Sequence, residues 1–279
     1  MDFDRLLPLL RCISCGGSLR PDGDKLACPA CGREYPFVDN IPAMLSPDAE
    51  ENVWENYFGR LTERKGDHEA ANSYFSLKNF ELVKSSVLGL IGEARGLSIL
   101  DVGCGTGHLL HSLAGKNLVV GVDISPTMLT FARSKGFSVV QSSGKKLPFE
   151  NGSFELVTAI NVLQSLKEGK VLTDELVRVT KPGGRIIVST PNGQNLAMGL
   201  FKILEKKKYR HLGVYTSEEL KDYFRSAGCK VESVLFLHYP WGKASRVPGD
   251  EAARFLDKRL ATGLVVEAVK TETRGAFHE

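Results

Sequence analysis

From residue 97 onward, short apolar runs alternate with amphipathic stretches, and this alternation constrains the fold more than any other feature. The runs that we predict as strands are 97–101, 118–123, 138–141, 154–160, 185–190, 231–238 and 263–269. Helices are predicted to begin at 108–113 and to cover 126–135, 172–180 and 216–226. Thr216 and Glu219 form a capping-box pattern at the start of the last helix. Such alternation predicts an α/β fold with a mostly parallel seven-stranded sheet and helices on both faces.

Two further regions precede this α/β part, which we take as residues 97–279. Residues 1–47 are rich in Cys, Gly and Pro, which indicates a small separate module. Residues 48–96 are polar and aromatic, and an apolar pattern there predicts a helix that serves as a connector or lid. The pattern runs through Phe75, Leu77, Phe80, Leu82, Val83 and Val87.

The bulk composition is that of a globular protein, with 42% hydrophobic and 25% charged residues among 279. The net charge of +3 (36 basic minus 33 acidic residues) neither requires nor excludes a nucleic-acid partner. No apolar run approaches the roughly 18–20 residues of a membrane helix. Residues 1–5 carry acids where a secretory signal carries basic residues, so we expect a cytoplasmic protein.

A glycine-rich loop follows the first predicted strand, in the sequence Asp101-Val-Gly-Cys-Gly-Thr-Gly107. His108 stands where a dinucleotide fingerprint needs its third glycine, and the loop lacks the Lys-Ser/Thr of a phosphate-binding loop. Asp123 ends the second strand, where a carboxylate can accept both hydroxyls of a ribose. Asp101 can attract an ammonium or sulfonium group. The loop therefore predicts a nucleoside ligand with a cationic end.

Residues 97–190 resemble the class I S-adenosylmethionine-dependent methyltransferases, which have a Rossmann-like fold. The motif 101–107 is similar to their first motif, and Val119-Val-Gly-Val-Asp123 to their second. Residues 145–155 resemble the stretch before their fourth strand, and 181–185 the turn before their fifth. The resemblance implies S-adenosylmethionine as cofactor, with its methionine part against Gly103 and Gly105 and its ribose on Asp123.

The resemblance also implies a wider set of cofactor-binding positions. In this chain they are Asp101, Gly103, Cys104, Gly105, Gly107, Asp123, Ile124, Ser143, Gly144 and Asn161. Ser143 departs from the family pattern, because many relatives carry an aspartate there that bonds the adenine amine. A hydroxyl can accept the same bond, but more weakly than a carboxylate.

Four cysteines at the N-terminus form the pattern Cys12-x2-Cys15 and Cys28-x2-Cys31 with 12 residues between the pairs. This spacing predicts a two-knuckle zinc ribbon, because a reducing compartment favours a metal site over disulfides; a redox or disulfide role is the alternative. Four thiolates give zinc a closed, structural shell.

The stretch 33–45 resembles the small zinc-ribbon proteins that activate RNA and release-factor methyltransferases. Fused in cis, such a ribbon can cover the catalytic domain, bind substrate, or only stabilise the chain.

The methyl acceptor is less defined by the sequence. Asn161, after the fourth strand, and His211 and Tyr215, after the fifth, are candidates for contacting it. Residues 196–210 form a basic amphipathic pattern that can meet RNA phosphates, an anionic membrane, or solvent. The main hypothesis is transfer to a small-molecule or quinone-like, lipid-like acceptor. An RNA base methyltransferase and a non-catalytic protein that retains the cofactor are the alternatives.

Overall fold

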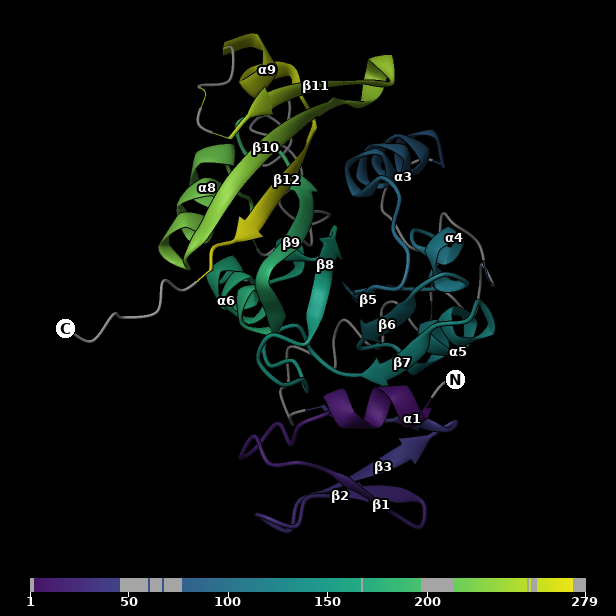
Figure 1. Ribbon diagram of the computed structural model, residues 1–279. Coiled ribbons are helices and arrows are strands. Elements are labelled where there is room, and N and C mark those ends of the chain that lie inside the picture. The colour runs from purple at the N-terminus through teal and green to yellow at the C-terminus, as the bar shows by residue number, and fades with distance from the viewer. Residues whose placement is uncertain are drawn as a thin grey trace, which may run out of the picture.

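The computed structural model describes residues 3–45, 60, 67, 77–166, 168–196, 213–249, 251 and 255–272. Within these ranges the strands form a small four-stranded sheet near the N-terminus and a large eight-stranded sheet. Figure 1 shows the small sheet below one edge of the large sheet, with helix α1 (Phe3–Leu6) between them. The predicted connector and the predicted basic helix lie for the most part outside the described residues, as does His211.

The small sheet is antiparallel and has the order β1-β2-β3-β4. Its strands are β1 (Arg20–Asp22), β2 (Lys25–Ala27), β3 (Glu34–Val38) and β4 (Ile41–Pro42). Asp39 and Asn40 join β3 to β4, and their φ angles of 51° and 57° fit a two-residue hairpin turn with both central residues left-handed. We call residues 3–45 the ribbon module.

The large sheet has the order β11-β10-β12-β9-β8-β5-β6-β7. Its strands are β5 (Ser98–Val102), β6 (Leu118–Asp123), β7 (Ser138–Gln141), β8 (Phe154–Ile160), β9 (Thr180–Pro191), β10 (Cys229–His238), β11 (Lys243–Pro248) and β12 (Gly263–Lys270). Strands β5 to β9 pair in parallel, whereas β12 pairs antiparallel with both β9 and β10. The carboxyl ends of β5, β6 and β8 therefore meet at one edge of the sheet.

Helices cover both faces of the large sheet (Figure 1). On one side lie α6 (Gly169–Val179) and α8 (Ser217–Ser226), and on the other α3 (Leu77–Ile91), α4 (His111–Ala114) and α5 (Pro126–Ser134). The short helices η1 (Leu7–Leu9), η3 (Leu163–Ser165), η4 (Tyr239–Trp241) and α9 (Phe255–Leu260) lie in the connections. The capping box predicted at Thr216 is present at the start of α8.

This architecture confirms the predicted fold class, and the predicted strands are found with small shifts at their ends. Strand β9 begins at Thr180 rather than Arg185, because the glycine turn 181–184 is a bulge opposite a single residue of β8. Helix α4 covers only four residues, so it is shorter than predicted. Strand β11 adds an edge that the sequence did not indicate, since its side chains are mostly exposed and lack an apolar alternation.

The ribbon module and the large sheet share a continuous hydrophobic core. Leu6, Leu10 and Met44 are fully buried in the same cluster as Phe149 and Phe154 of the α/β domain.

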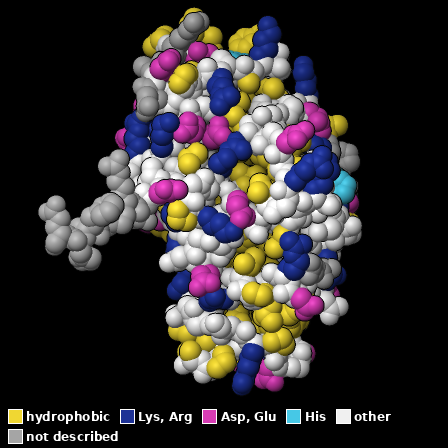
Figure 2. Space-filling model, in the orientation of Figure 1, with side chains coloured by type: hydrophobic (Ala, Val, Ile, Leu, Met, Phe, Trp, Pro, Cys, Tyr) yellow, Lys and Arg dark blue, Asp and Glu magenta, His cyan; other side chains and the backbone are white. Residues whose placement is uncertain are grey.

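Figure 2 shows that Lys and Arg side chains are interspersed with Asp and Glu side chains over the visible face of the molecule. Within the described ranges, the structure contains no helix that is both long and apolar enough to cross a membrane.

Candidate cofactor pocket and metal centre

A pocket opens at the carboxyl ends of β5, β6 and β8, where the parallel strands meet the loops that follow them. Ligands bind at this edge in open parallel sheets. The lining residues are Val102, Gly103, Gly105, Val122, Asp123, Ile124, Met128, Ser142, Ser143, Gly144, Lys145, Ile160, Asn161, Val162, Ser165 and Leu166. Seven of them are among the ten predicted cofactor-binding positions.

The glycine-rich loop is held close to β6 and to the loop after β8. The backbone N–H groups of Gly103 and Cys104 both donate to the carbonyl oxygen of Val122, at 2.7 and 3.1 Å. Gly103 has a φ of +69°, and a Cβ there would lie 2.3 Å from a methyl carbon of Val162. Glycine is therefore required at this position by the approach of Val162 as well as by backbone conformation.

Three of the predicted cofactor-binding positions do not line the pocket but lie beside it. They are Gly107, Cys104 and Asp101. A Cβ on Gly107 would lie 3.1 Å from the Cα of Ala132, so this glycine lets the loop pack on α5. The side chain of Cys104 is buried against Gly121, and burial raises the pKa of its thiol well above the usual value. Asp101, the third, is buried behind the loop.

Asp123 places its carboxylate at the tip of β6, facing the pocket. Its Oδ2 accepts the Gly105 N–H at 2.9 Å, and its Oδ1 accepts the Ser125 N–H at 3.0 Å. Burial raises the pKa of Asp123, and the N–H donors oppose that shift. A carboxylate has about four acceptor sites, so each oxygen retains capacity for a ligand hydroxyl.

Asp101 is paired with a hydroxyl. The Oγ1 of Thr158 donates to the Oδ1 of Asp101 at 2.6 Å. Burial raises the pKa of Asp101 to about 7, a shift that the Thr158 hydrogen bond opposes and the charge of Asp123 reinforces. A cationic ligand group nearby favours the ionised form.

Ser143 and Gly144 form part of the wall opposite the glycine-rich loop. The Ser143 Oγ accepts the N–H of Lys145 at 3.2 Å, so the hydroxyl hydrogen is not used in this contact. A Cβ on Gly144 would lie 3.0 Å from a methyl carbon of Leu172. The pocket therefore offers a hydroxyl and a closely packed backbone where the sequence predicts the adenine.

Of the candidate acceptor contacts that lie among the described residues, Asn161 lines the pocket and Tyr215 does not. Asn161 lines the pocket at a left-handed φ of 58°, with its N–H bonded to the Ser189 carbonyl at 3.0 Å. Tyr215 is 5% exposed, does not line the pocket, and donates its hydroxyl to the Leu166 carbonyl at 3.1 Å. Burial raises the pKa of Tyr215. This hydrogen bond therefore connects the residues before α8 to the loop after β8.

Sequence reasoning missed most of the apolar lining. Met128 lies in the first turn of α5, and its place after the Asp123 loop is a signal that could have identified it. Val162, Ser165 and Leu166 belong to η3 and the residues around it, and no motif marks them. These residues extend the lining of the pocket beyond the predicted cofactor contacts.

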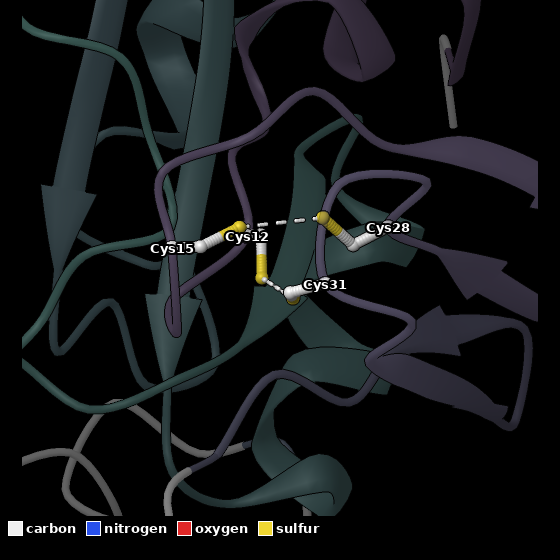
Figure 3. A group of neighbouring side chains, drawn as sticks. All are labelled: Cys12, Cys15, Cys28 and Cys31. Carbon is white, nitrogen blue, oxygen red and sulfur yellow. Dashed lines mark hydrogen bonds between the residues drawn. The ribbon is translucent and has the colours of Figure 1, made fainter.

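The four N-terminal cysteines converge in the ribbon module (Figure 3). Their sulfur atoms all lie within 4.8 Å of one another; Cys12 and Cys31 are 3.6 Å apart, and Cys15 and Cys28 are 3.5 Å apart. A Zn–S bond of about 2.3 Å in a tetrahedron places sulfur atoms about 3.8 Å apart. The cluster therefore fits a zinc ion.

Both cysteine pairs lie in the same kind of turn. The N–H of Gly16 donates to the Cys12 carbonyl, and the N–H of Gly32 to the Cys28 carbonyl, each at 2.8 Å. Both glycines have left-handed φ angles, 76° and 73°. The hydroxyl of Tyr35 contacts the Cys12 sulfur at 3.1 Å, an outer contact of the kind that orients metal ligands.

The parallel sheet, the glycine-rich loop and the acid at the tip of the second parallel strand define a class I S-adenosylmethionine-dependent methyltransferase. A family model described as "Methyltransferase domain" matches residues 100–188. The demethylmenaquinone methyltransferase of Lactococcus lactis subsp. lactis is 31% identical over 170 residues, which cover 56% of this chain and 68% of that protein. The chain belongs to this methyltransferase family.

Two further comparisons agree with this assignment. The ubiquinone biosynthesis O-methyltransferase of Xanthomonas euvesicatoria is 28% identical over 181 residues, or 59% of this chain and 76% of that protein. The crystal structure of magnesium protoporphyrin IX methyltransferase from Synechocystis, with bound S-adenosylhomocysteine, has a TM-score of 0.57 and 18% identity. That match covers 80% of this chain and 100% of the other, and it supports the fold.

Proposed function

We propose that this methyltransferase acts on a small quinone-like or lipid-like acceptor, with the ribbon module binding structural zinc. The names of the relatives from Lactococcus and Xanthomonas favour this acceptor class. The observation that carries the proposal is the pocket wall formed by Ile160, Val162 and Leu166, which presents apolar side chains beside the predicted methionine end of the cofactor. An apolar ring can bury its faces there.

S-adenosylmethionine supplies an electrophilic methyl group, and the protein holds the acceptor in line with it and excludes water. Among the described lining residues, Asp123 and Lys145 are the ones with formal charge at neutral pH. We assign Asp123 to the ribose, and we assign to Asn161 the orientation of a polar group on the acceptor. The Asn161 Oδ1 lies 3.4 Å from the Ser189 hydroxyl, which leaves the amide nitrogen as the donor toward the pocket.

Transfer of label from methyl-labelled S-adenosylmethionine tests the proposal. The acceptors are hydroquinones and catechols with short isoprenoid tails, and total RNA in a parallel reaction. We expect label in the quinone extract and a rate at least tenfold lower for Asn161→Ala. Lys170→Ala, an exposed substitution on α6, is the matched control and should leave the rate unchanged.

Label in RNA and none in the quinone extract would overturn the acceptor class. Label in neither fraction, with S-adenosylhomocysteine still bound, would overturn the proposed acceptor class in favour of a protein acceptor or a non-catalytic protein.

A further inference from the structure

The ribbon module contacts the α/β domain at two backbone positions that bracket one segment. At the first, the N–H of Met44 donates to the Gln141 carbonyl at 2.7 Å, and Ala43 forms a parallel bridge with the same residue. The ribbon thereby adds to the edge strand β7, whose outer side otherwise offers unpaired backbone groups.

The second position lies just before β8. The N–H of Arg11 donates to the Pro148 carbonyl at 2.8 Å, and Leu10 forms an antiparallel bridge with Phe149. The side chain of Arg11 also pairs with Glu150. The ribbon is therefore bonded to the chain immediately before and after residues 142–147, which we call the wall segment.

The wall segment forms one side of the cofactor pocket. Four of its residues, Ser142, Ser143, Gly144 and Lys145, line the cavity. The N–H of Ser142 donates to the Asp123 carbonyl at 3.1 Å. The side-chain amide of Gln141 donates to the carbonyl of Ile124, another lining residue, at 3.0 Å. One residue, Gln141, thus joins the ribbon to both loops on the predicted adenine and ribose side of the pocket.

We propose that the ribbon module positions the wall segment for cofactor binding, with Gln141 as the positioning residue, so that metal loading and cofactor affinity are coupled. The inference rests on the proposed zinc site and on the cofactor pocket, and it does not depend on the acceptor. A segment held at both ends loses less conformational freedom when a ligand binds, and a competent pocket is populated more of the time. Coupling of this kind is reciprocal, so bound cofactor must also strengthen metal binding.

The first test separates the docking contact from the metal. Met44→Pro removes the N–H that bonds Gln141 and keeps all four cysteines, whereas Met44→Ala removes the side chain and keeps the N–H. We expect both variants to retain one zinc per chain. S-adenosylhomocysteine, measured by calorimetry, should bind Met44→Pro at least fivefold more weakly than Met44→Ala. Hydrogen exchange of a peptide covering 142–147 should speed up in the proline variant.

The second test follows the metal and the side chain. Cys12→Ser combined with Cys15→Ser should lose zinc and bind S-adenosylhomocysteine at least tenfold more weakly, and Gln141→Leu should weaken binding while retaining zinc. Saturating S-adenosylhomocysteine should raise the apparent zinc affinity of the wild type, in competition with a chelator, by the same factor as zinc raises cofactor affinity. Lys25→Ala breaks the exposed pair with Glu34 in the ribbon, and it should change neither affinity.

Equal cofactor affinity and equal exchange of the wall segment in the two Met44 variants would overturn the inference. A zinc-free wild type that binds cofactor with unchanged affinity after zinc is added would overturn the coupling to metal. Neither result depends on finding the acceptor, so failure of the proposed function is distinguishable from failure of this inference.

Discussion

Asp101 is a buried carboxyl group that does not line the pocket but is one of the positions predicted to bind the cofactor. It is 2% exposed, and its pKa is raised to about 7, mainly by burial. In an unfolded chain an aspartate has a pKa of about 3.9. Because the folded pKa is the higher one, Asp101 contributes stability below pH 4 that is lost as the pH rises through about 7. A cationic ligand group near Asp101 favours the charged carboxylate and opposes that loss.

Cofactor affinity should therefore depend on pH through Asp101. We expect the affinity for S-adenosylmethionine to rise between pH 5.5 and about 7.5 and then to level off, because below the pKa of about 7 binding must displace a proton from this carboxyl. Calorimetry in two buffers of different ionisation enthalpy would measure that proton release. In Asp101→Asn the release should disappear over this range. The same pH dependence in the asparagine variant would assign the proton to another group.

Asp123 should contribute to affinity through its charge and its hydrogen bonds to the ribose. Asp123→Ala is expected to weaken S-adenosylhomocysteine binding by tenfold or more, since a charge-assisted hydrogen bond contributes about 1.5–3 kcal/mol. Asp123→Asn keeps the size of the side chain and should have a smaller effect. Thr216→Ala, in the helix cap of α8, serves as a control for general loss of stability. Unchanged affinity in Asp123→Ala would contradict the ribose assignment.

Residue patterns could identify the polar half of the pocket and not its apolar half. Asp123 ends the parallel strand β6 and Ser143 follows β7, and such positions converge at one edge of the sheet whatever the loops do. Val162 and Leu166 reach the pocket because the loop after β8 folds back over Gly103. That path depends on packing between segments distant in the chain, for which the local sequence carries no periodic signal.

At the scale of elements, the glycine-rich loop is fixed by its fit to the loop after β8. Gly103→Ala should disrupt this fit, because a methyl group would lie 2.3 Å from the Val162 side chain at a φ of +69°. We expect lower stability, by about 1–3 kcal/mol for the strained backbone alone, and at least tenfold weaker cofactor binding. Urea unfolding and calorimetry would measure the two effects.

A double variant separates the two causes of this effect. Adding Val162→Ala removes the clashing methyl groups but leaves the backbone strain, so it should restore part of the lost affinity. Gly23→Ala, at a left-handed glycine in the ribbon with open space around it, controls for backbone strain alone. No recovery in the double variant would show that the steric conflict with Val162 is not the cause.

Element boundaries illustrate what local sequence can and cannot predict. The parallel strands are buried apolar runs, so their positions follow from the sequence. The bulge in β9 depends on a pairing with β8 in which the four residues 181–184 stand opposite the single residue Glu155. Strand β11 exists because it pairs with β10 along six residues, although its own side chains are mostly exposed. Backbone pairing of this kind leaves little trace in the residue types.

At the scale of the whole molecule, the ribbon module is built into the α/β domain. Leu10 is fully buried, and its backbone pairs with Phe149, which makes an edge-to-face contact with Phe154 of β8. The spacing of the cysteines predicts the ribbon but gives no information on where it docks. Because the two parts share one hydrophobic cluster, we expect them to unfold as one cooperative unit.

Leu10→Ala tests this cooperativity. A buried leucine replaced by alanine costs about 2–5 kcal/mol, and the loss should appear in both parts of the chain if they form one unit. Native-state hydrogen exchange should show the same decrease in unfolding free energy for peptides of β8 as for peptides of β2 and β3. Lys25→Ala, which alters only an exposed pair, should change neither by more than about 0.5 kcal/mol. Loss of protection confined to β2 and β3 would mean that the ribbon unfolds on its own. Since the wall segment lies between the two docking contacts, that outcome would also confine any effect of the ribbon on the cofactor to those contacts.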